Sequence, residues 1–567
     1  MAKMAYKVLH VIKSSFILSL EILVSILLST LIVPLGLIFA LINELIRFGV
    51  SVILRIQHGS KISLAPEGAD NIWAYKKTNN ARTCLSLLFC AKEIDMEQHR
   101  KLYMSRVINH TTKHGRKPYN KLRKILITRC GYHCHKQDEN FDIKNHVIVY
   151  PGTDENDMIV GESQLMNDIL PTLFNDMDES KPQWEEVVIQ RFKKESSSAP
   201  CSIRIFRYHH GLMDGASNLL LWTACMTEDQ GASFPYPVNP LMESAKISKC
   251  QRFLYDLSCV ILGAFTMVKS IINAGRLRSR FVTRNYTGKR HFGWSESISV
   301  DVLRKIKNTC KASVPSMLAT AMGGAFRKLN DKFPHAIYGN PEEIIIGLVS
   351  ALVPYPNHDL RNQFTVVHFP VNTGSMENLN TSSHIQRLHV INQNMAKVGR
   401  DPMVYLNYFM FKYFGRFPSW LIQSMMENGG LPVVFSNVPM STEIVEFWGN
   451  PVITAAGWPP LLTNTGLGIV TMRYADHMRF CAVADEACLS SEAVDYFLKQ
   501  VSIELKELAE ECSAFETVIH KSDSIIMASN DLVLNSYTNP KDINISTVTM
   551  DFRRGSIVPS QIIDVIE

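Results

Sequence analysis

The chain has 567 residues, more than one hydrophobic core usually supports, so two folded units are expected. Apolar residues make up 46% and charged residues 20%, a balance that excludes a largely disordered protein. The net charge of +6 is small for this length and gives no indication of nucleic-acid binding.

The N-terminal segment, residues 1–58, contains an uncharged apolar run, ILVSILLSTLIVPLGLIFALI, at residues 22–42. At about 1.5 Å per residue, this run is long enough to cross the hydrocarbon core of a bilayer. Because the apolar part of a secretory signal is usually shorter, we predict a retained transmembrane anchor. Pro34 and Gly36 lie inside the run, so a kinked or re-entrant segment is the alternative.

Residues 59–245 are predicted to form a mixed α/β unit, because strand-like and helix-like patterns alternate. The strand-like stretches are 84–94, 144–152, 184–192 and 201–210, and the helix-like stretches are 95–112 and 160–176.

Residues 246–289 combine an apolar stretch, LSCVILGAFTMV, with flanking lysines and arginines and few acidic residues. This composition is typical of a segment that lies in a lipid interface, and a core helix followed by a solvated basic linker is the alternative.

A second α/β unit is predicted at residues 290–512, followed by a polar tail at 513–567. Within the second unit, residues 405–426 are crowded with aromatic side chains. They are predicted to line an apolar tunnel, to touch lipid, or simply to form a core helix.

The 12 cysteines are scattered, which is typical of a domain in a reducing compartment. The one tight cluster, CGYHCH, contains Cys130, His133, Cys134 and His135. A zinc site usually needs a second ligand pair elsewhere, and the sequence offers none at a suitable spacing. We therefore expect free thiols here and no metal.

Two histidines end the strand-like stretch CSIRIFRYHH, and Asp214 and Gly215 follow before a helix-like stretch. Histidine titrates near neutral pH, so a neutral imidazole of His209 or His210 can accept a proton from a hydroxyl group. The Asp214 carboxylate is expected to fix the turn by pairing with an arginine, and Gly215 to adopt a backbone angle that a β-carbon forbids. No G-x-S-x-G elbow is present, so a direct transfer without a covalent nucleophile is predicted.

The H-H-x-x-x-D-G pattern resembles the hallmark of the CoA-dependent acyltransferase superfamily. Other segments resemble the wax ester synthase/diacylglycerol acyltransferase family in the same order along residues 60–510. These segments are FDIKNHVIV, DESKPQWEEVVI, HFGWSESISVDVLRKIKNTCKASVPSMLATAMGGAFRKL, LRNQF, FSNVP and GLGIVTMRYADHMRFCAVAD.

The resemblance implies two chloramphenicol-acetyltransferase-like subdomains with a tunnel between them, where acyl-CoA and a hydroxyl acceptor meet. It implies His210 as general base, His209 as its support and Asp214 as a structural residue. Gly215, Ser436 and Asn437 are expected at the substrate site. The predicted function is transfer of a fatty acyl group from acyl-CoA, the cosubstrate, to a fatty alcohol or diacylglycerol, with no cofactor. The predicted location is a membrane, the endoplasmic reticulum or alternatively the plasma membrane.

Two positions depart from the family pattern. Pro315-Ser316 replaces Asn-Asp at the start of the small-residue helix, and Met440-Ser441 replaces Gly-Pro after Ser-Asn-Val-Pro. These departures keep two alternatives open. One is an acyltransferase that acts on a different hydroxyl or amine, and the other is an inactive relative that binds or carries lipid.

Overall fold

The computed structural model describes residues 2–533 with short internal gaps, and between residues 223 and 284 it describes Cys250 and Leu254 alone. The predicted linker at 246–289 therefore lies almost entirely outside the described residues.

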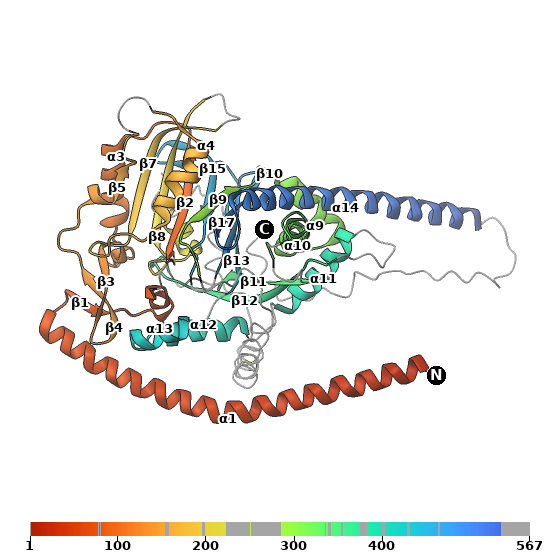
Figure 1. The fold of residues 1–567 in the computed structure, drawn as a ribbon, viewed down its shortest axis with the longest axis horizontal. Coiled ribbons are helices and arrows are strands. Elements are labelled where there is room, and N and C mark those ends of the chain that lie inside the picture. The colour runs from red at the N-terminus through yellow and green to blue at the C-terminus, as the bar shows by residue number, and fades with distance from the viewer. Residues whose placement is uncertain are drawn as a thin grey trace.

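Two seven-stranded sheets form the body of the protein (Figure 1). The first has the order β14 (Glu446–Phe447), β15 (Asn450–Trp458), β2 (Thr83–Cys90), β8 (Cys201–His209), β7 (Trp184–Lys193) and β5 (Val147–Val149), with β6 (Val160–Gly161) beside β7. The second has the order β10 (Ile298–Ser299), β17 (His477–Asp485), β16 (Leu467–Tyr474), β13 (Val433–Ser441), β11 (Glu343–Ala351) and β12 (Phe364–Asn372), with β9 (Arg290–Trp294) beside β17.

Two strands of the second unit belong to the first sheet. β14 and β15 lie within the second unit in sequence, yet β15 pairs antiparallel with β2, from Val452 opposite Cys90 to Trp458 opposite Leu85. Side chains of β2 are buried on both faces, which explains its nearly continuous apolar run. The pairing of β15 with β2 joins the two units through backbone hydrogen bonds.

The helices of the second unit cover its sheet. They are α9 (Val300–Cys310), α10 (Val314–Lys332), α11 (Ser383–Val398) and α14 (Ser491–Val533). The small residues of α10 permit close packing, since a β-carbon at Gly323 would lie 2.3 Å from the Asn372 carbonyl oxygen. α14 continues to Val533, so the first part of the region predicted as a polar tail is helical.

Short helices of the first unit flank the first sheet and position its loops. They are α2 (Gly68–Asn71), α3 (Met96–Leu102), α4 (Glu162–Gln164), α5 (Leu170–Phe174) and α6 (Gly215–Leu221). Two further helices, α12 (Met403–Phe414) and α13 (Ser419–Glu427), lie between the sheets and α1 in Figure 1, at the lower edge of the body.

The N-terminal apolar segment forms one long helix, α1 (Ala2–His58), with Pro34 inside it. Within it, Pro34–His58 is long and apolar enough to cross a membrane by length and composition. Figure 1 shows α1 (red) running beneath the body of the protein, on the side of α12 and α13. A small sheet of β1 (Ile62–Leu64), β4 (Tyr132–Gln137) and β3 (Lys124–Arg129) lies at its C-terminal end.

Candidate active site

A cavity of about 490 Å³ lies between elements of the two large sheets. Its walls come from β2, β8 and α6 and from β11, β12, β13, β15, β16 and α12. Most of the lining side chains are apolar, and a volume of this size is typical of pockets that enclose an organic ligand. Of the residues predicted for the site, the cavity is lined by His210, Asp214, Gly215, Ser436 and Asn437.

His210 follows directly after the last residue of β8. Its ring lies flat against the indole of Trp73, with ring centroids 3.8 Å apart and planes 14° apart. Phe364 covers it from another side, with a centroid separation of 5.6 Å. Burial lowers the pKa of His210 to about 4, while its own carbonyl and the Asn362 side chain act against the lowering. The imidazole is therefore neutral at physiological pH, the form that a general base requires.

The loop that carries His210 is braced from behind by a buried polar cluster. The Asn362 amide nitrogen donates to the His210 carbonyl oxygen at 2.8 Å and to Asp70 Oδ1 at 2.8 Å. Asp70 in turn accepts a hydrogen bond from Lys121 Nζ at 2.6 Å, and Lys121 also donates to the Leu212 carbonyl. These bonds hold the backbone on both sides of Gly211.

His209 does not line the cavity, although it lies next to His210 in sequence. Its Nδ1 accepts a hydrogen bond from the Gly211 backbone N–H at 3.0 Å, and it has a further hydrogen bond with the Trp73 backbone. Burial lowers the pKa of His209 well below its usual range, and Arg82 adds to the effect. The ring is therefore neutral and fixed in the loop, which fits a supporting position.

Asp214 begins α6 as its N-cap residue. Oδ1 accepts from the Ser217 backbone N–H at 2.8 Å, and Oδ2 accepts from the Tyr355 hydroxyl and the Gln363 backbone N–H, each at 2.7 Å. The expectation that Asp214 pairs with an arginine is wrong, because neutral donors bind both of its carboxylate oxygens. Burial raises the pKa of Asp214, while these hydrogen bonds oppose the rise.

Gly215 is the first residue of α6, and its φ does not lie in the left-handed region. The predicted special backbone angle is therefore wrong. A β-carbon here would lie 3.8 Å from Val438 Cγ2, an ordinary van der Waals contact at the cavity wall. The absence of a side chain at Gly215 therefore enlarges the cavity, and it is not needed for the backbone conformation.

Ser436 and Asn437 lie on β13, which pairs in parallel with β16. The Asn437 Oδ1 atom accepts a hydrogen bond from the Thr471 hydroxyl at 2.7 Å. Because its oxygen is engaged, the amide nitrogen is the group that Asn437 can offer to the cavity.

The two departures from the family pattern bring apolar atoms to the same cavity. Pro315, near the start of α10, and Met440, near the end of β13, both line it. The serines next to them form hydrogen bonds within the protein. The Ser316 hydroxyl donates to Asn392 Oδ1 at 2.9 Å, and the Ser441 hydroxyl donates to the Glu443 carbonyl at 2.7 Å. Pro315 thus places an apolar ring at the cavity wall where the family pattern has Asn, and Met440 places a longer apolar side chain there where the pattern has Gly.

Trp73 and Tyr355 contact His210 and Asp214, and neither was predicted because they belong to no recognisable sequence pattern. The LRNQF segment was recognised, but no role was predicted for Asn362, which braces the His210 loop, or for Phe364, which covers the His210 ring.

The CGYHCH cluster does not gather ligands. Cys130 lies in the turn before β4 with a φ of 49°, and Cys134 points to the opposite face of the strand from His133 and His135. Cys130 and Cys134 are free thiols, as predicted.

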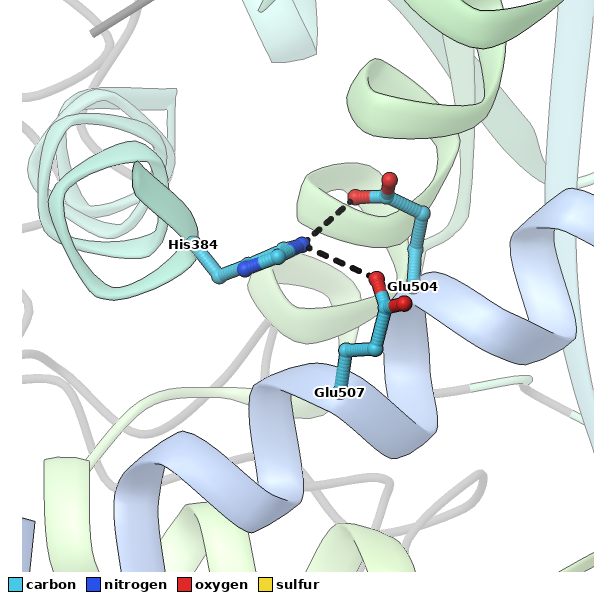
Figure 2. A group of neighbouring side chains, drawn as sticks. All are labelled: His384, Glu504 and Glu507. Carbon is cyan, nitrogen blue, oxygen red and sulfur yellow. Dashed lines mark ion pairs between the residues drawn. The ribbon is translucent and has the colours of Figure 1, made fainter. Parts of the chain in front are cut away.

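Among the described residues, three potential metal ligands converge at His384, Glu504 and Glu507 (Figure 2). His384 Nε2 lies 3.2 Å from Glu504 and 3.4 Å from Glu507, and Nδ1 lies 2.7 Å from Glu511. Hydrogen bonds with Glu504 and Glu511 raise the pKa of His384 to about 9, so the ring is an imidazolium at neutral pH.

Two further cations complete this cluster, because Lys328 lies 2.9 Å and Arg387 3.3 Å from Glu504. A metal would need a neutral imidazole and free carboxylates. The cluster is therefore an ion-pair network that ties α10 and α11 to α14.

Comparison with solved structures defines the class of fold. The trichothecene 15-O-acetyltransferase TRI3 from Fusarium sporotrichioides is 11% identical, with a TM-score of 0.51 over 79% of this chain and 96% of that one. The protein thus has the predicted two-subdomain, chloramphenicol-acetyltransferase-like α/β fold. A wax ester synthase/diacylglycerol acyltransferase structure from Marinobacter aquaeolei VT8 is 15% identical, with a TM-score of 0.48 over 78% of this chain and 98% of that one.

Sequence comparison then shows which family part of the chain matches. Residues 360–508 match the WS/DGAT C-terminal domain. A segment of 225 residues, 37% of this chain, is 28% identical to wax ester synthase/diacylglycerol acyltransferase 2 from Arabidopsis thaliana. Residues 360–508 of the chain therefore carry the C-terminal domain of the wax ester synthase/diacylglycerol acyltransferase family, as the motifs of this region indicated. The match spans 45% of the Arabidopsis protein's length.

Proposed function

We propose that the protein transfers a fatty acyl group from acyl-CoA to a lipid hydroxyl, a fatty alcohol or diacylglycerol, with His210 as general base. The observation that carries the proposal is a buried, neutral imidazole on the wall of an apolar cavity between the two subdomains. The match of residues 360–508 to the family's C-terminal domain supports the reaction class, and the apolar wall supports a lipophilic acceptor.

In the proposed reaction, His210 Nε2 takes the proton from the acceptor hydroxyl while the hydroxyl oxygen attacks the thioester carbonyl carbon. A tetrahedral intermediate forms and its C–S bond breaks. The CoA thiolate leaves and takes the proton from the imidazolium, so the products are the ester and CoA thiol, and the base is regenerated. The Asn437 amide is proposed to donate to a substrate oxygen.

The surroundings of His210 suit this role. Its Nδ1 atom is buried, with no hydrogen-bond partner at good geometry among the described residues, so Nε2 is the nitrogen we assign to the acceptor hydroxyl. Stacking on Trp73 excludes water from one face of the ring. A base with a pKa of about 4 is weak, but it needs no deprotonation before the substrate binds.

A second candidate is a lipid-binding protein without catalysis, favoured by the replacements at Pro315 and Met440 in the cavity wall. The two functions differ in whether bound acyl-CoA is consumed. The apolar helix α1 supports a membrane location, and the endoplasmic reticulum is the compartment we propose.

The test is expression of the wild type, His210→Ala and a control, His477→Ala, in cells that lack neutral-lipid acyltransferases. His477 is an exposed histidine on β17. Labelled fatty acid is supplied with or without fatty alcohol, and lipid classes are separated. We expect labelled wax ester or triacylglycerol with the wild type and control, and its loss with His210→Ala at equal protein level. Equal label in all three would refute the catalytic role of His210.

A further inference from the structure

One narrow stripe of α1 is docked on the folded body. Its buried side chains are Asn43, Arg47, Val50 and Leu54, which recur at helical spacing on one face. The docking is partly polar, since Arg47 donates to the Arg416 carbonyl at 3.0 Å and the Tyr132 hydroxyl donates to Asn43 Oδ1 at 2.9 Å. This part of α1 is therefore held at a fixed place against the protein.

The rest of that stretch is apolar and exposed. Phe48 is 71% exposed and Ile56 is 79% exposed, and the other exposed large apolar residues of the stretch are Leu41, Ile42, Leu45, Ile46, Val52 and Ile53. The sequence from 34 to 54 contains two charged residues, Glu44 and Arg47. Both bond to the body, because Arg416 forms a double hydrogen bond with Glu44 at 2.8 and 2.6 Å.

The docked stripe conflicts with a simple transmembrane span. Tyr132 starts β4, and the hairpin that joins β3 to β4 exposes Arg129 and Lys136 to the solvent. If Asn43–Leu54 lay in the hydrocarbon core, these charges would lie at a similar depth, where charged side chains are strongly disfavoured. The docked stretch therefore belongs at the surface of a bilayer, with its apolar face inward.

α12 and α13 present further apolar surface on the same side of the molecule (Figure 1). Trp420 is 66% exposed and Tyr413 is 53% exposed, and these are the residue types enriched where a membrane meets water. The Phe417 ring, between the two helices, lies 5.0 Å from the Phe39 ring of α1.

The same two helices separate α1 from the cavity. Two pairs of rings lie along these helices: the centroids of Phe417 and Phe414 are 5.6 Å apart, and those of Phe411 and Phe364 are 6.1 Å apart. Phe414 and Phe411 are about one helical turn apart on α12. Phe411 lines the cavity, and Phe364 contacts His210. The α12 side of the cavity, which is the side nearest α1, is thus also the side from which Phe364 contacts the proposed base His210.

We propose that α1 lies in the plane of a lipid bilayer rather than across it, with both of its ends on the side that holds the folded body. The outer face of α1, together with Trp420 and Tyr413, contacts the lipid. The α12–α13 wall of the cavity then faces the bilayer, and this second part rests on the proposed function, since it makes the bilayer the source of the acceptor.

Topology is tested in sealed microsomes that contain the full chain with epitopes at its N-terminus and in the body. Added protease should digest both epitopes without detergent. If the N-terminal epitope were protected from protease and became digestible only after detergent was added, α1 would span the membrane and the proposal would be overturned.

Membrane contact is tested by flotation of the purified protein with phosphatidylcholine–phosphatidylserine vesicles. The double variant Phe48→Asp/Ile56→Asp places two charges on the outer face of α1. The matched control is Ile444→Asp, since Ile444 is also 71% exposed but lies outside the proposed surface. We expect vesicle binding to fall about tenfold or more for the double variant and to stay unchanged for the control. If vesicle binding fell equally for the double variant and the control, or fell for neither of them, the assigned membrane-binding surface would be contradicted.

Acyl transfer separates failure of this proposal from failure of the proposed function. The double variant should keep wild-type activity on a short, water-soluble alcohol and lose activity on a long-chain alcohol presented in vesicles. Equal activity on both acceptors would refute the bilayer as acceptor source. An inactive wild type would refute the proposed function and leave the flotation and topology results to decide the position of α1.

Discussion

Trp73 stacks on His210 with their ring centroids 3.8 Å apart, and the pair forms one wall of the cavity. The contact removes water from a titratable ring, and burial is the main cause of its lowered pKa. Trp73 is thus a positioning residue for the proposed base.

Replacing Trp73 with alanine should expose one face of His210. The pKa of His210 should then rise toward the ordinary value of about 6.5, and the turnover number should fall about tenfold or more because the ring loses its position. The pH profile of acyl transfer checks this, and Trp73→Phe, which keeps an aromatic face, should restore most of the rate. If the acidic side of the pH profile were the same in Trp73→Ala as in the wild type, Trp73 would have no role in setting the pKa of His210.

The wild-type enzyme should keep its activity well below the pH at which free histidine is protonated. Because the pKa of His210 is lowered to about 4, the base stays neutral and competent as the pH falls through 6.5. The measurement is kcat/KM between mildly acidic and neutral pH, under conditions where the protein stays folded. An inflection near pH 6.5 that Trp73→Ala leaves in place would show that another histidine controls the reaction.

Asp214 should act mainly on the stability of the loop. Asp214→Asn keeps the shape but leaves the Gln363 N–H and the Tyr355 hydroxyl with a weaker or mismatched partner, so the free energy of unfolding should fall by about 1–3 kcal/mol. Tyr355→Phe removes one of these donors and should cost less. Thermal unfolding of both variants compares them, and a larger cost for Tyr355→Phe would contradict the assigned geometry.

The size of the side chain at residue 215 should affect the acceptor more than the fold. Gly215→Ala adds a β-carbon that fits beside Val438, so it should be nearly neutral. Gly215→Leu should fill part of the cavity and raise KM for a long-chain acceptor several-fold, with little change in thermal stability. If Gly215→Ala alone unfolded the protein, the glycine would have a backbone role after all.

The ion-pair network at His384 should make stability depend on pH in the alkaline range. The pKa of His384 is raised to about 9 in the folded protein, against about 6.5 when unfolded, so its contribution is full below pH 6.5 and disappears as pH rises through 9. His384→Gln should lower the free energy of unfolding by about 1–2 kcal/mol near pH 6. Denaturant unfolding at several pH values checks this, and a difference that persists unchanged above pH 9 would contradict it.

The sequence predicted the two-unit α/β fold and the place of His210 at a strand end because both depend on local patterns. Alternating apolar runs such as residues 201–209 reveal a strand, and the motif marks its end. The stacking of Trp73 and the brace from Asp70 could not be predicted, since 137 and 140 positions separate them from His210 and no pattern links them.

Two expectations were wrong for a related reason. An arginine was expected to pair with the Asp214 carboxylate and so fix the turn, but backbone N–H groups and Tyr355 supply the donors instead. Gly215 was expected to adopt a backbone angle that a β-carbon forbids, whereas Asp214 already starts a regular helix there. Both outcomes depend on segments that are distant in sequence or on cap geometry.

The proposed reaction requires that His210 removes the proton from the acceptor hydroxyl. Purified wild type and His210→Ala, with His477→Ala as control, are mixed with a long-chain acyl-CoA and a fatty alcohol, and CoA thiol and ester are measured together. We expect the wild type and the control each to form CoA thiol and ester in equal amounts. In His210→Ala we expect the rate of ester formation to fall by about 100-fold or more, with unchanged thermal unfolding. Ester formation by a folded His210→Ala protein at the wild-type rate would contradict it.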